Sequence, residues 1–187
     1  MKLILGSSSK YRQKVLRNGG IEFDVIKPEI DEKQIRHPDP QELTLLIARA
    51  KSDAVIAKLK EPAIVVTSDE VGVADGKLLE KPISLDEARE TIKHYFVHPP
   101  SFVTSVVVKN TATGKRVEGS EWGTVYFKPI PDDVLEKFLA EGDALNCAGA
   151  FTAEDPLLVP YLTFDGGLDC IIGMPLELTK RLIRKVS

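Results

Sequence analysis

The sequence predicts an α/β protein with two lobes and a cleft between them. Short apolar runs at residues 3–5 and 63–67 are typical of buried strands, and segments with clear helix-start signals alternate with such runs. The 187 residues are enough for one substantial core or two small lobes. No internal repeat or low-complexity linker interrupts the chain. We therefore expect a single domain over residues 1–187.

Composition narrows the class of ligand and the cell compartment. The chain is 43% hydrophobic and 28% charged with a net charge of -3, which argues against nucleic-acid polymers and anionic membranes and favours a small anionic ligand. Cys147 and Cys170 form no C-x-x-C motif and histidines are few, so neither a zinc site nor a disulfide framework is expected. There is no signal-peptide pattern and no apolar run of membrane-spanning length, so we expect a cytoplasmic protein without membrane association.

The first element is a strand at residues 3–5, followed by a small polar turn and a helix at residues 11–18. Such a turn places free backbone N–H groups beside the positive end of a helix dipole, which suits a phosphate. Ser7 and Ser9 add hydroxyl donors, and Arg12 adds a forked cation. The pattern alone equally allows Ser9 to be a simple helix cap and Arg12 a solvated charge.

A second strand at residues 22–27 leads into an acidic loop at 28–32 that contains Glu32. Asp39, Pro40 and Glu42 then give a strong helix start, and we expect this helix to run to about residue 59. Its predicted buried face comprises Leu43, Leu46, Ile47, Ala50, Ala54 and Ala57. Lys51 lies at the edge of that face, where it either delivers its ammonium group into the cleft or is an ordinary exposed lysine.

The β-branched run at residues 63–67 predicts a central strand with Ser68, Asp69 and Glu70 at its C-terminal end. Ligands of α/β sheets usually bind at such ends, so Asp69 is well placed for chemistry. Asp75-Gly76 predicts a tight turn. Asp69 and Lys81 would then lie on the two arms of a hairpin, with their side chains meeting at one mouth.

The second half of the chain predicts the other lobe. A capping box at residues 84–87 opens a helix whose Ala88, Ile92 and Tyr95 share a face. His94 and His98 are interpreted as structural or surface residues. Strands at 102–108 and 123–127, a helix at 131–141, an irregular stretch at 142–160 and a C-terminal helix complete the chain.

The order of these signals resembles the Maf family of nucleoside triphosphate pyrophosphatases over nearly the whole chain. The resemblance is carried by Leu3-Ile4-Leu5-Gly6-Ser7-Ser8-Ser9, Ile30-Asp31-Glu32, Ser68-Asp69, Lys81-Pro82, Ala148-Gly149-Ala150-Phe151 and Ile172-Gly173-Met174-Pro175-Leu176. It implies an elongated mixed-sheet fold like that of inosine triphosphate pyrophosphatases, with a deep nucleotide-binding cleft. It also implies Mg²⁺-dependent (or Mn²⁺-dependent) cleavage between the α and β phosphates, and a homodimer.

The resemblance also implies residue roles. Ser7, Ser9 and Arg12 match the family's phosphate-binding turn, and Lys51 and Lys81 match its two lysines. Glu32 and Asp69 match the carboxylates associated with the metal and with water activation, Asp69 being the proton acceptor. The chain departs from the family at Lys10, Gln13 and Glu80, where the family commonly has proline, a basic residue and glycine. None of these changes removes a catalytic group.

Base preference is implied by three further positions. The pyrimidine-triphosphate subgroup has Arg, Thr and Gln where this chain has Tyr11, Glu70 and Glu154. The 7-methyl-GTP subgroup has an aromatic residue, Gln and Glu there, which is closer. An aromatic face can stack on the cationic methylated base, and a carboxylate can accept hydrogens from the guanine edge. Glu70 departs from that subgroup, and Tyr11 and Glu154 also fit ordinary helix packing and a solvated loop acid.

Two alternatives stay open at this stage. The first is a dTTP/UTP pyrophosphatase of the same family whose specificity positions have drifted. The second is a nucleotide-binding regulator of cell division with little catalysis, against which the intact set of Glu32, Lys51, Asp69 and Lys81 argues.

Overall fold

The computed structural model describes all residues from 1 to 187 and contains seven strands and six α-helices, joined by turns and short 3₁₀ segments. Along the chain these are β1 (Lys2–Leu5), α1 (Lys10–Asn18), β2 (Asp24–Val25), α2 (Pro40–Ile56), β3 (Ala63–Ala74), β4 (Lys77–Leu78), α3 (Leu85–His94), β5 (Ser101–Asn110), β6 (Arg116–Phe127), α4 (Asp132–Glu141), β7 (Leu162–Asp165), α5 (Leu168–Ile171) and α6 (Leu176–Val186). The predicted α/β class is confirmed. None of the helices combines the length and the apolar character that crossing a membrane requires.

The strands form one mixed sheet in the order β2-β1-β3-β5-β6-β7, with the short β4 paired to β3. β1 runs parallel to both β2 and β3, and its register with β3 pairs Lys2 with Ala63 and Leu5 with Val66. β4 is antiparallel to β3, and β7 is antiparallel to β6. A strand that is flanked on both sides, such as β3, is expected to be rich in β-branched residues, as its Ile-Val-Val-Thr run is.

The chain divides into two compact units. The first comprises Met1–Glu70, Val103–Trp122 and Asp169–Ser187, and the second comprises Val71–Phe102 and Gly123–Leu168. The three longest strands, β3, β5 and β6, each contribute residues to both units. Two units agree with the two predicted lobes, whereas the cleft between the lobes and the single domain over 1–187 stay predictions.

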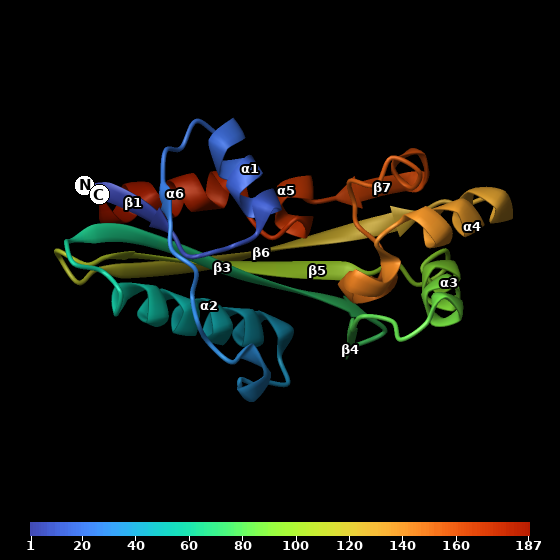
Figure 1. The fold of residues 1–187 in the computed structure, drawn as a ribbon, viewed down its shortest axis with the longest axis horizontal. Coiled ribbons are helices and arrows are strands. Elements are labelled where there is room, and N and C mark those ends of the chain that lie inside the picture. The colour runs from blue at the N-terminus through green and yellow to red at the C-terminus, as the bar shows by residue number, and fades with distance from the viewer. The chain divides into compact units, whose positions relative to one another are not determined.

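In the first unit, helices cover both faces of the sheet, with α2 on one side and α1 and α6 on the other (Figure 1). Alternation along the strands separates the two cores. Residues on the α1 and α6 side include Leu5, Val66 and Leu182, whereas Ile4 and Val65 pack with Val55 of α2 on the other side. One face of β1 and β3 therefore packs against α1 and α6, and the other face packs against α2.

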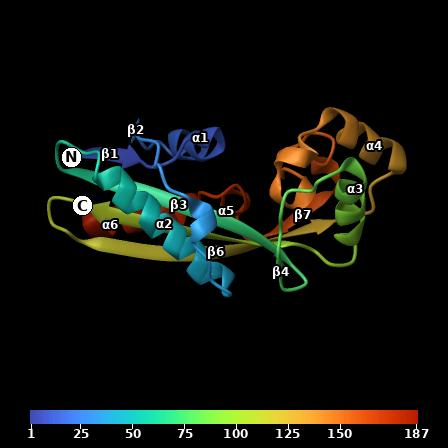
Figure 2. The ribbon, with the colours of Figure 1, turned by 60° about the horizontal axis from the view of Figure 1, so that its bottom comes forward.

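In the second unit, α3 and α4 lie side by side (Figure 2) and are joined by ion pairs from Arg89 to Glu136 and from Lys93 to Asp132. The core contains an aromatic cluster in which Tyr95, Phe102 and Phe127 each pack against Phe151 with ring-centroid distances of 4.9–5.9 Å. The predicted face of α3 is confirmed, because Ala88, Ile92 and Tyr95 are all buried.

Several predicted boundaries were wrong. β2 is confined to two residues, β3 continues past residue 67 to Ala74, and β6 begins at Arg116 instead of residue 123. β3 is longer because it is paired at both ends: Leu5 of β1 pairs with Val66, and Leu78 of β4 pairs with Val73. The Asp75-Gly76 turn is confirmed, and both residues have positive φ, 49° and 72°.

The predicted buried face of α2 was also partly wrong. Leu43 and Ile47 are buried, but the remaining buried positions are Thr44, Leu45, Ala48, Lys51, Ser52 and Val55, and the predicted Ala57 is exposed. Two polar members of this face, Thr44 and Lys51, contact side chains on the sheet. Thr44 Oγ1 lies 2.7 Å from Ser105 Oγ, which in turn lies 2.7 Å from Ser120 Oγ. Lys51 therefore projects from the buried face of the helix.

Candidate active site

The turn between β1 and α1 consists of small residues, and two of its serine side chains form hydrogen bonds with nearby backbone N–H groups. Ser9 is the N-cap of α1, and its Oγ accepts a hydrogen bond from the backbone N–H of Arg12 at 3.4 Å. Ser7 is buried, and its Oγ accepts from the N–H of Ser9 at 3.2 Å. Because both hydroxyls act as acceptors in these bonds, their own hydrogens stay available for a ligand oxygen.

Glycine at position 6 lets this turn approach β3 closely. The Gly6 N–H donates to the carbonyl of Val66 at 2.8 Å. A Cβ at this position would lie 2.6 Å from Cγ2 of Thr67 and 2.9 Å from Cγ2 of Val55, which is closer than carbon atoms can pack. The predicted phosphate-binding turn is therefore fixed against both the central strand and α2.

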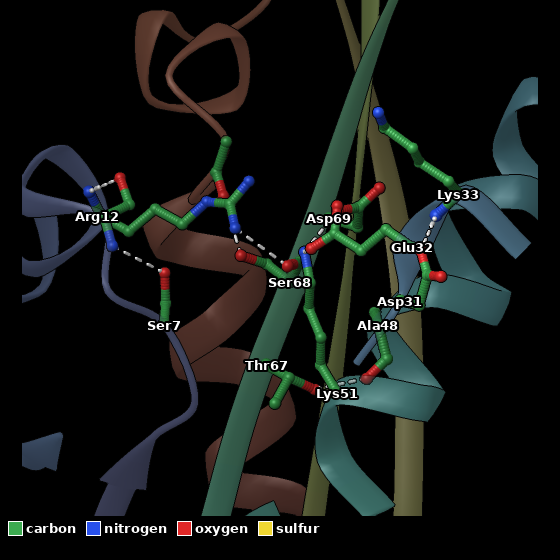
Figure 3. Close-up of polar contacts among 12 residues, drawn as sticks. Ser7, Arg12, Asp31, Glu32, Lys33, Ala48, Lys51, Thr67, Ser68 and Asp69 are labelled. Carbon is green, nitrogen blue, oxygen red and sulfur yellow. Dashed lines mark hydrogen bonds and ion pairs between the residues drawn. The ribbon is translucent and has the colours of Figure 1, made fainter. Parts of the chain in front are cut away.

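Arg12 extends from the first turn of α1 to β3, where its Nη1 donates to the carbonyl oxygen of Ser68 at 3.0 Å (Figure 3). Its Nε and Nη2 lie against Gly173, at 3.0 Å from the place of a Cβ there, and the Glu70 carboxylate lies against the same place. Gly173 has a φ of 88° and accepts a hydrogen bond from Ser68 Oγ at 3.0 Å. A glycine is thus required where the guanidinium and the Glu70 carboxyl meet.

Lys51 lies between two carboxylates. Its Nζ is 2.6 Å from Oδ1 of Asp69 and 2.9 Å from Oε1 of Glu32, and these contacts are drawn in Figure 3. The side chains of Lys51 and Asp69 are 8% and 7% exposed, whereas that of Glu32 is 51% exposed. The ammonium group therefore joins a buried acid on the sheet to a half-exposed acid on the loop before α2.

The position of Lys51 follows from how α2 is attached to β3. Thr67 Oγ1 donates to the carbonyl of Ala48 at 2.8 Å, one helical turn before Lys51. Asp69 lies two residues after Thr67, so both side chains project from the same face of the strand. On the other side of the lysine, Asp31 Oδ1 accepts from the N–H of Lys33 at 3.1 Å and caps the 3₁₀ turn Glu32–Gln34.

The same alternation separates Asp69 from its two neighbours. Asp69 faces α2 and Lys51, whereas Ser68 and Glu70 face Gly173 on the opposite side of β3. The prediction that Asp69 follows the end of the strand was wrong, because β3 continues for five more residues to Ala74. The position of the Asp69 side chain is set instead by the packing of β3 against α2.

Burial dominates the electrostatics of both acids. It raises the pKa of Asp69, and the Lys51 ammonium opposes this rise through its charge and its hydrogen bond. Burial raises the pKa of Glu70 to about 8, with Arg12 opposing the rise and Asp69 adding to it. At neutral pH the Glu70 carboxyl is therefore largely protonated, whereas Asp69 keeps a cation in contact that stabilises its ionised form.

The structure thus brings together Ser7, Ser9 and Arg12 at one side of β3, and Glu32, Lys51 and Asp69 at the other. Tyr11 lies on α1 with 51% of its surface exposed, next to Arg12 in the chain. Lys81 and Glu154 belong to the second unit, where Lys81 is exposed and Glu154 is partly exposed. The predicted meeting of Asp69 and Lys81 at one mouth stays a prediction.

Sequence reasoning missed the contacts that hold these side chains in place. They are made by Thr67 to the Ala48 carbonyl, by Ser68 to the Gly173 carbonyl and by Asp31 to the turn that carries Glu32. The Thr67-x-Asp69 spacing on a strand was the available signal, since it places a hydroxyl and an acid on one face. The helix carbonyl that Thr67 binds could not be found without the packing of α2.

The oxygen atoms of Glu32 and Asp69 are the donor type that Mg²⁺ prefers. They lie within 2.9 Å and 2.6 Å of one ammonium nitrogen, so two carboxylates already converge on a single cationic group. This pair therefore fits a hard divalent cation.

The family described as "Maf-like protein" matches residues 2–186. A 7-methyl-GTP pyrophosphatase of Dictyostelium discoideum is 44% identical to this chain over 192 residues, covering 99% of this chain and 97% of the relative. A 7-methyl-GTP pyrophosphatase of Idiomarina loihiensis is 35% identical, covering 94% and 89%. A nucleoside triphosphate pyrophosphatase of Synechococcus is 30% identical, covering 99% and 94%. These matches confirm the family resemblance seen in the sequence.

Proposed function

Because the chain belongs to the Maf-like protein family, we propose that it is a nucleoside triphosphate pyrophosphatase that releases a nucleoside monophosphate and pyrophosphate. The observation that carries the proposal is the buried Lys51, which lies 2.6 Å from Asp69 and 2.9 Å from Glu32. Burying a charged lysine costs free energy, even when acidic side chains pair with it. Buried charged groups are therefore often found at functional sites, where the chemistry requires them. The relatives named above as pyrophosphatases support this assignment.

In the proposed reaction, Asp69 accepts a proton from the water that attacks the anhydride phosphorus. Burial favours its protonated product state, and Lys51 favours the ionised state that begins the reaction. The same contact fixes the orientation of the carboxylate before substrate binds. Asp69 is thus both held in place and poised to accept a proton.

The phosphate chain is proposed to bind at the β1–α1 turn. The hydroxyl hydrogens of Ser7 and Ser9 can donate to phosphate oxygens, and the N-terminal end of α1 attracts negative charge. Arg12 keeps its guanidinium beside this turn through the Ser68 carbonyl, and Lys81 of the second unit is proposed as a further phosphate cation. These groups would neutralise charge on the leaving pyrophosphate.

Glu32 and Asp69 are proposed to hold Mg²⁺, or Mn²⁺ in its place, as a cofactor. The metal would supply Lewis-acid polarisation of the phosphate oxygens when bound. Both carboxylates now share the Lys51 ammonium, whose donors would keep them oriented.

The proposed substrate is 7-methyl-GTP or another modified nucleotide, with Tyr11, Glu70 and Glu154 reading the base. Glu70 differs from the glutamine of the 7-methyl-GTP subgroup, but with a pKa of about 8 its neutral carboxyl carries one O–H donor and one carbonyl acceptor at pH 7. The side-chain amide of glutamine also offers a donor and an acceptor. Protonated Glu70 can therefore take the place of glutamine, so the departure at this position is compatible with the subgroup assignment. A cytoplasmic homodimer is proposed on the resemblance alone.

Pyrophosphate release from a nucleotide panel tests these proposals. We expect hydrolysis that requires Mg²⁺ or Mn²⁺ and favours 7-methyl-GTP over GTP, dTTP and UTP. Asp69→Asn should lower kcat by about 10²–10⁴-fold, the usual contribution of a general base. Asp53→Asn, which changes an exposed acid two residues after Lys51 on α2, is the matched control and should keep parent activity.

The possible outcomes separate the alternatives. Preference for dTTP or UTP would overturn the base assignment and leave the pyrophosphatase assignment in place. Nucleotide binding without pyrophosphate release would favour the regulator. Near-parent kcat for Asp69→Asn at saturating Mg²⁺ would show that Asp69 is not the proton acceptor.

A further inference from the structure

A group of side chains with potential metal-ligand atoms lies in the second unit. It comprises Asp75 in the β3–β4 turn, His94 at the end of α3 and His98 just beyond it, and it is called here the Asp75 cluster. One potential ligand atom from each residue lies within 4.8 Å of the other two. Both histidines are exposed, and the sequence pattern alone indicated no zinc site.

The two imidazoles converge on one carboxylate. His94 Nε2 lies 2.6 Å from Oδ2 of Asp75, and His98 Nδ1 lies 3.1 Å from Oδ1. The rings stack with centroids 4.4 Å apart and planes 13° apart. The histidines are four positions apart, and the His98 N–H donates to the His94 carbonyl at 3.0 Å, so a helical turn holds them on one side.

Asp75 is held in place by its own backbone. It and Gly76 form the two central residues of the hairpin turn, both with positive φ. Pairing of Val73 with Leu78 and of Ala74 with Lys77 fixes this turn. An exposed aspartate carboxylate is ionised at neutral pH, which is the form that a metal ligand must take.

We propose that Asp75, His94 and His98 form a binding site for a divalent transition-metal ion such as Zn²⁺. Zinc binds imidazole nitrogens and carboxylate oxygens at about 2.0–2.2 Å, which places neighbouring ligand atoms in a tetrahedral site about 3.4 Å apart. Because the ligand atoms already lie within 4.8 Å of one another, the exposed side chains reach that spacing by changes of at most about 1.4 Å. A fourth position would be left for water.

The donor set distinguishes this site from the one proposed for Mg²⁺. Two imidazoles and one carboxylate suit zinc, copper or nickel, whereas the all-oxygen pair of Glu32 and Asp69 suits magnesium. Bound metal would also cross-link the β3–β4 turn to the end of α3. It would close one edge of a hollow of about 700 Å³ that Asp75 and His94 line together with Lys77, Glu90 and Lys93.

Zinc affinity of the purified chain tests the proposal without reference to activity. The probe is Zn²⁺ in competition with a chromophoric chelator, followed by Co²⁺ absorption to report the coordination geometry. We expect one ion per chain. His98→Ala and His94→Ala should each weaken zinc binding by at least about tenfold, since even loss of an outer partner of a metal ligand costs 10–100-fold. Asp75→Asn should weaken it too while tolerating the positive φ.

His37→Ala is the matched control, because His37 is partly exposed and its Nδ1 accepts from the N–H of Asp39 at 3.1 Å. It should bind zinc like the parent, as should Asp69→Asn. Zinc should raise the melting temperature of the parent and of His37→Ala but not that of His98→Ala. Equal affinity of His98→Ala and the parent would overturn the site. Loss of zinc binding in Asp69→Asn would place the ion at the proposed Mg²⁺ site instead.

Discussion

Replacing Lys51 with methionine should destabilise the protein in a strongly pH-dependent manner. The substitution keeps an unbranched side chain that is one heavy atom shorter, and it removes the ammonium that lies 2.6 Å from the buried Asp69 carboxylate. Breaking a buried ion pair by removing one partner typically costs about 3–5 kcal/mol, because the remaining charge is left without compensation. Glu32 is half exposed and regains water, so Asp69 carries most of this cost.

Protonation of Asp69 limits the cost and sets its pH dependence. Burial already raises the pKa of Asp69, and loss of Lys51 removes the main opposing influence. Within the window between the unfolded pKa, about 3.9, and the higher folded pKa, the folded state holds a proton that the unfolded state has lost. The free energy of unfolding therefore falls as pH rises, by up to about 1.4 kcal/mol per pH unit. The destabilisation should reach at most about 4 kcal/mol at pH 7 and about 1.5 kcal/mol at pH 5.

Urea unfolding of parent and variant at pH values from 5 to 8 measures this effect. Lys58→Met is the matched control, since Lys58 pairs with Glu29 at 3.0 Å on the surface and should lose less than about 1 kcal/mol at every pH. The double variant Lys51→Met/Asp69→Asn removes both charges and should recover stability at pH 7. Equal losses for Lys51→Met and Lys58→Met, or a double variant no more stable than Lys51→Met, would refute the reasoning.

Two further predictions concern the opposite face of β3 and the turn beside it. With a folded pKa of about 8 against an ordinary 4.5, Glu70 should make the free energy of unfolding fall as pH rises through that window. Glu70→Gln should show a flatter dependence in the same urea experiment, and parallel curves for parent and variant would contradict the pKa. Gly6→Ala should cost about 1–3 kcal/mol, because its Cβ would press on Thr67 and Val55. The exposed Ser8→Ala is its control, and a thermal unfolding curve unchanged in both would show that the turn is not tightly packed.

The sequence by itself determined the elements whose signals are local. Asp39 and Ser84 cap α2 and α3 through the N–H groups of Glu42 and Glu87, as their capping patterns predicted. The Asp75-Gly76 turn was predictable because few residue pairs accept positive φ at both positions. The family resemblance was likewise carried by motifs that can be read along the chain. The caps and the turn depend on residues at most four positions apart.

Only the tertiary structure decided which side chains meet. The Lys51 ammonium can be buried because it is paired with Asp69 on the sheet, and a pattern of apolar residues on one helix cannot show that. Asp69 and Glu70 adjoin in sequence but face different partners, because β3 continues through both. The Asp75 cluster joins a turn to a helix end 19 residues away. Contacts between distant segments follow from how the elements pack, and that information is not contained in local sequence patterns.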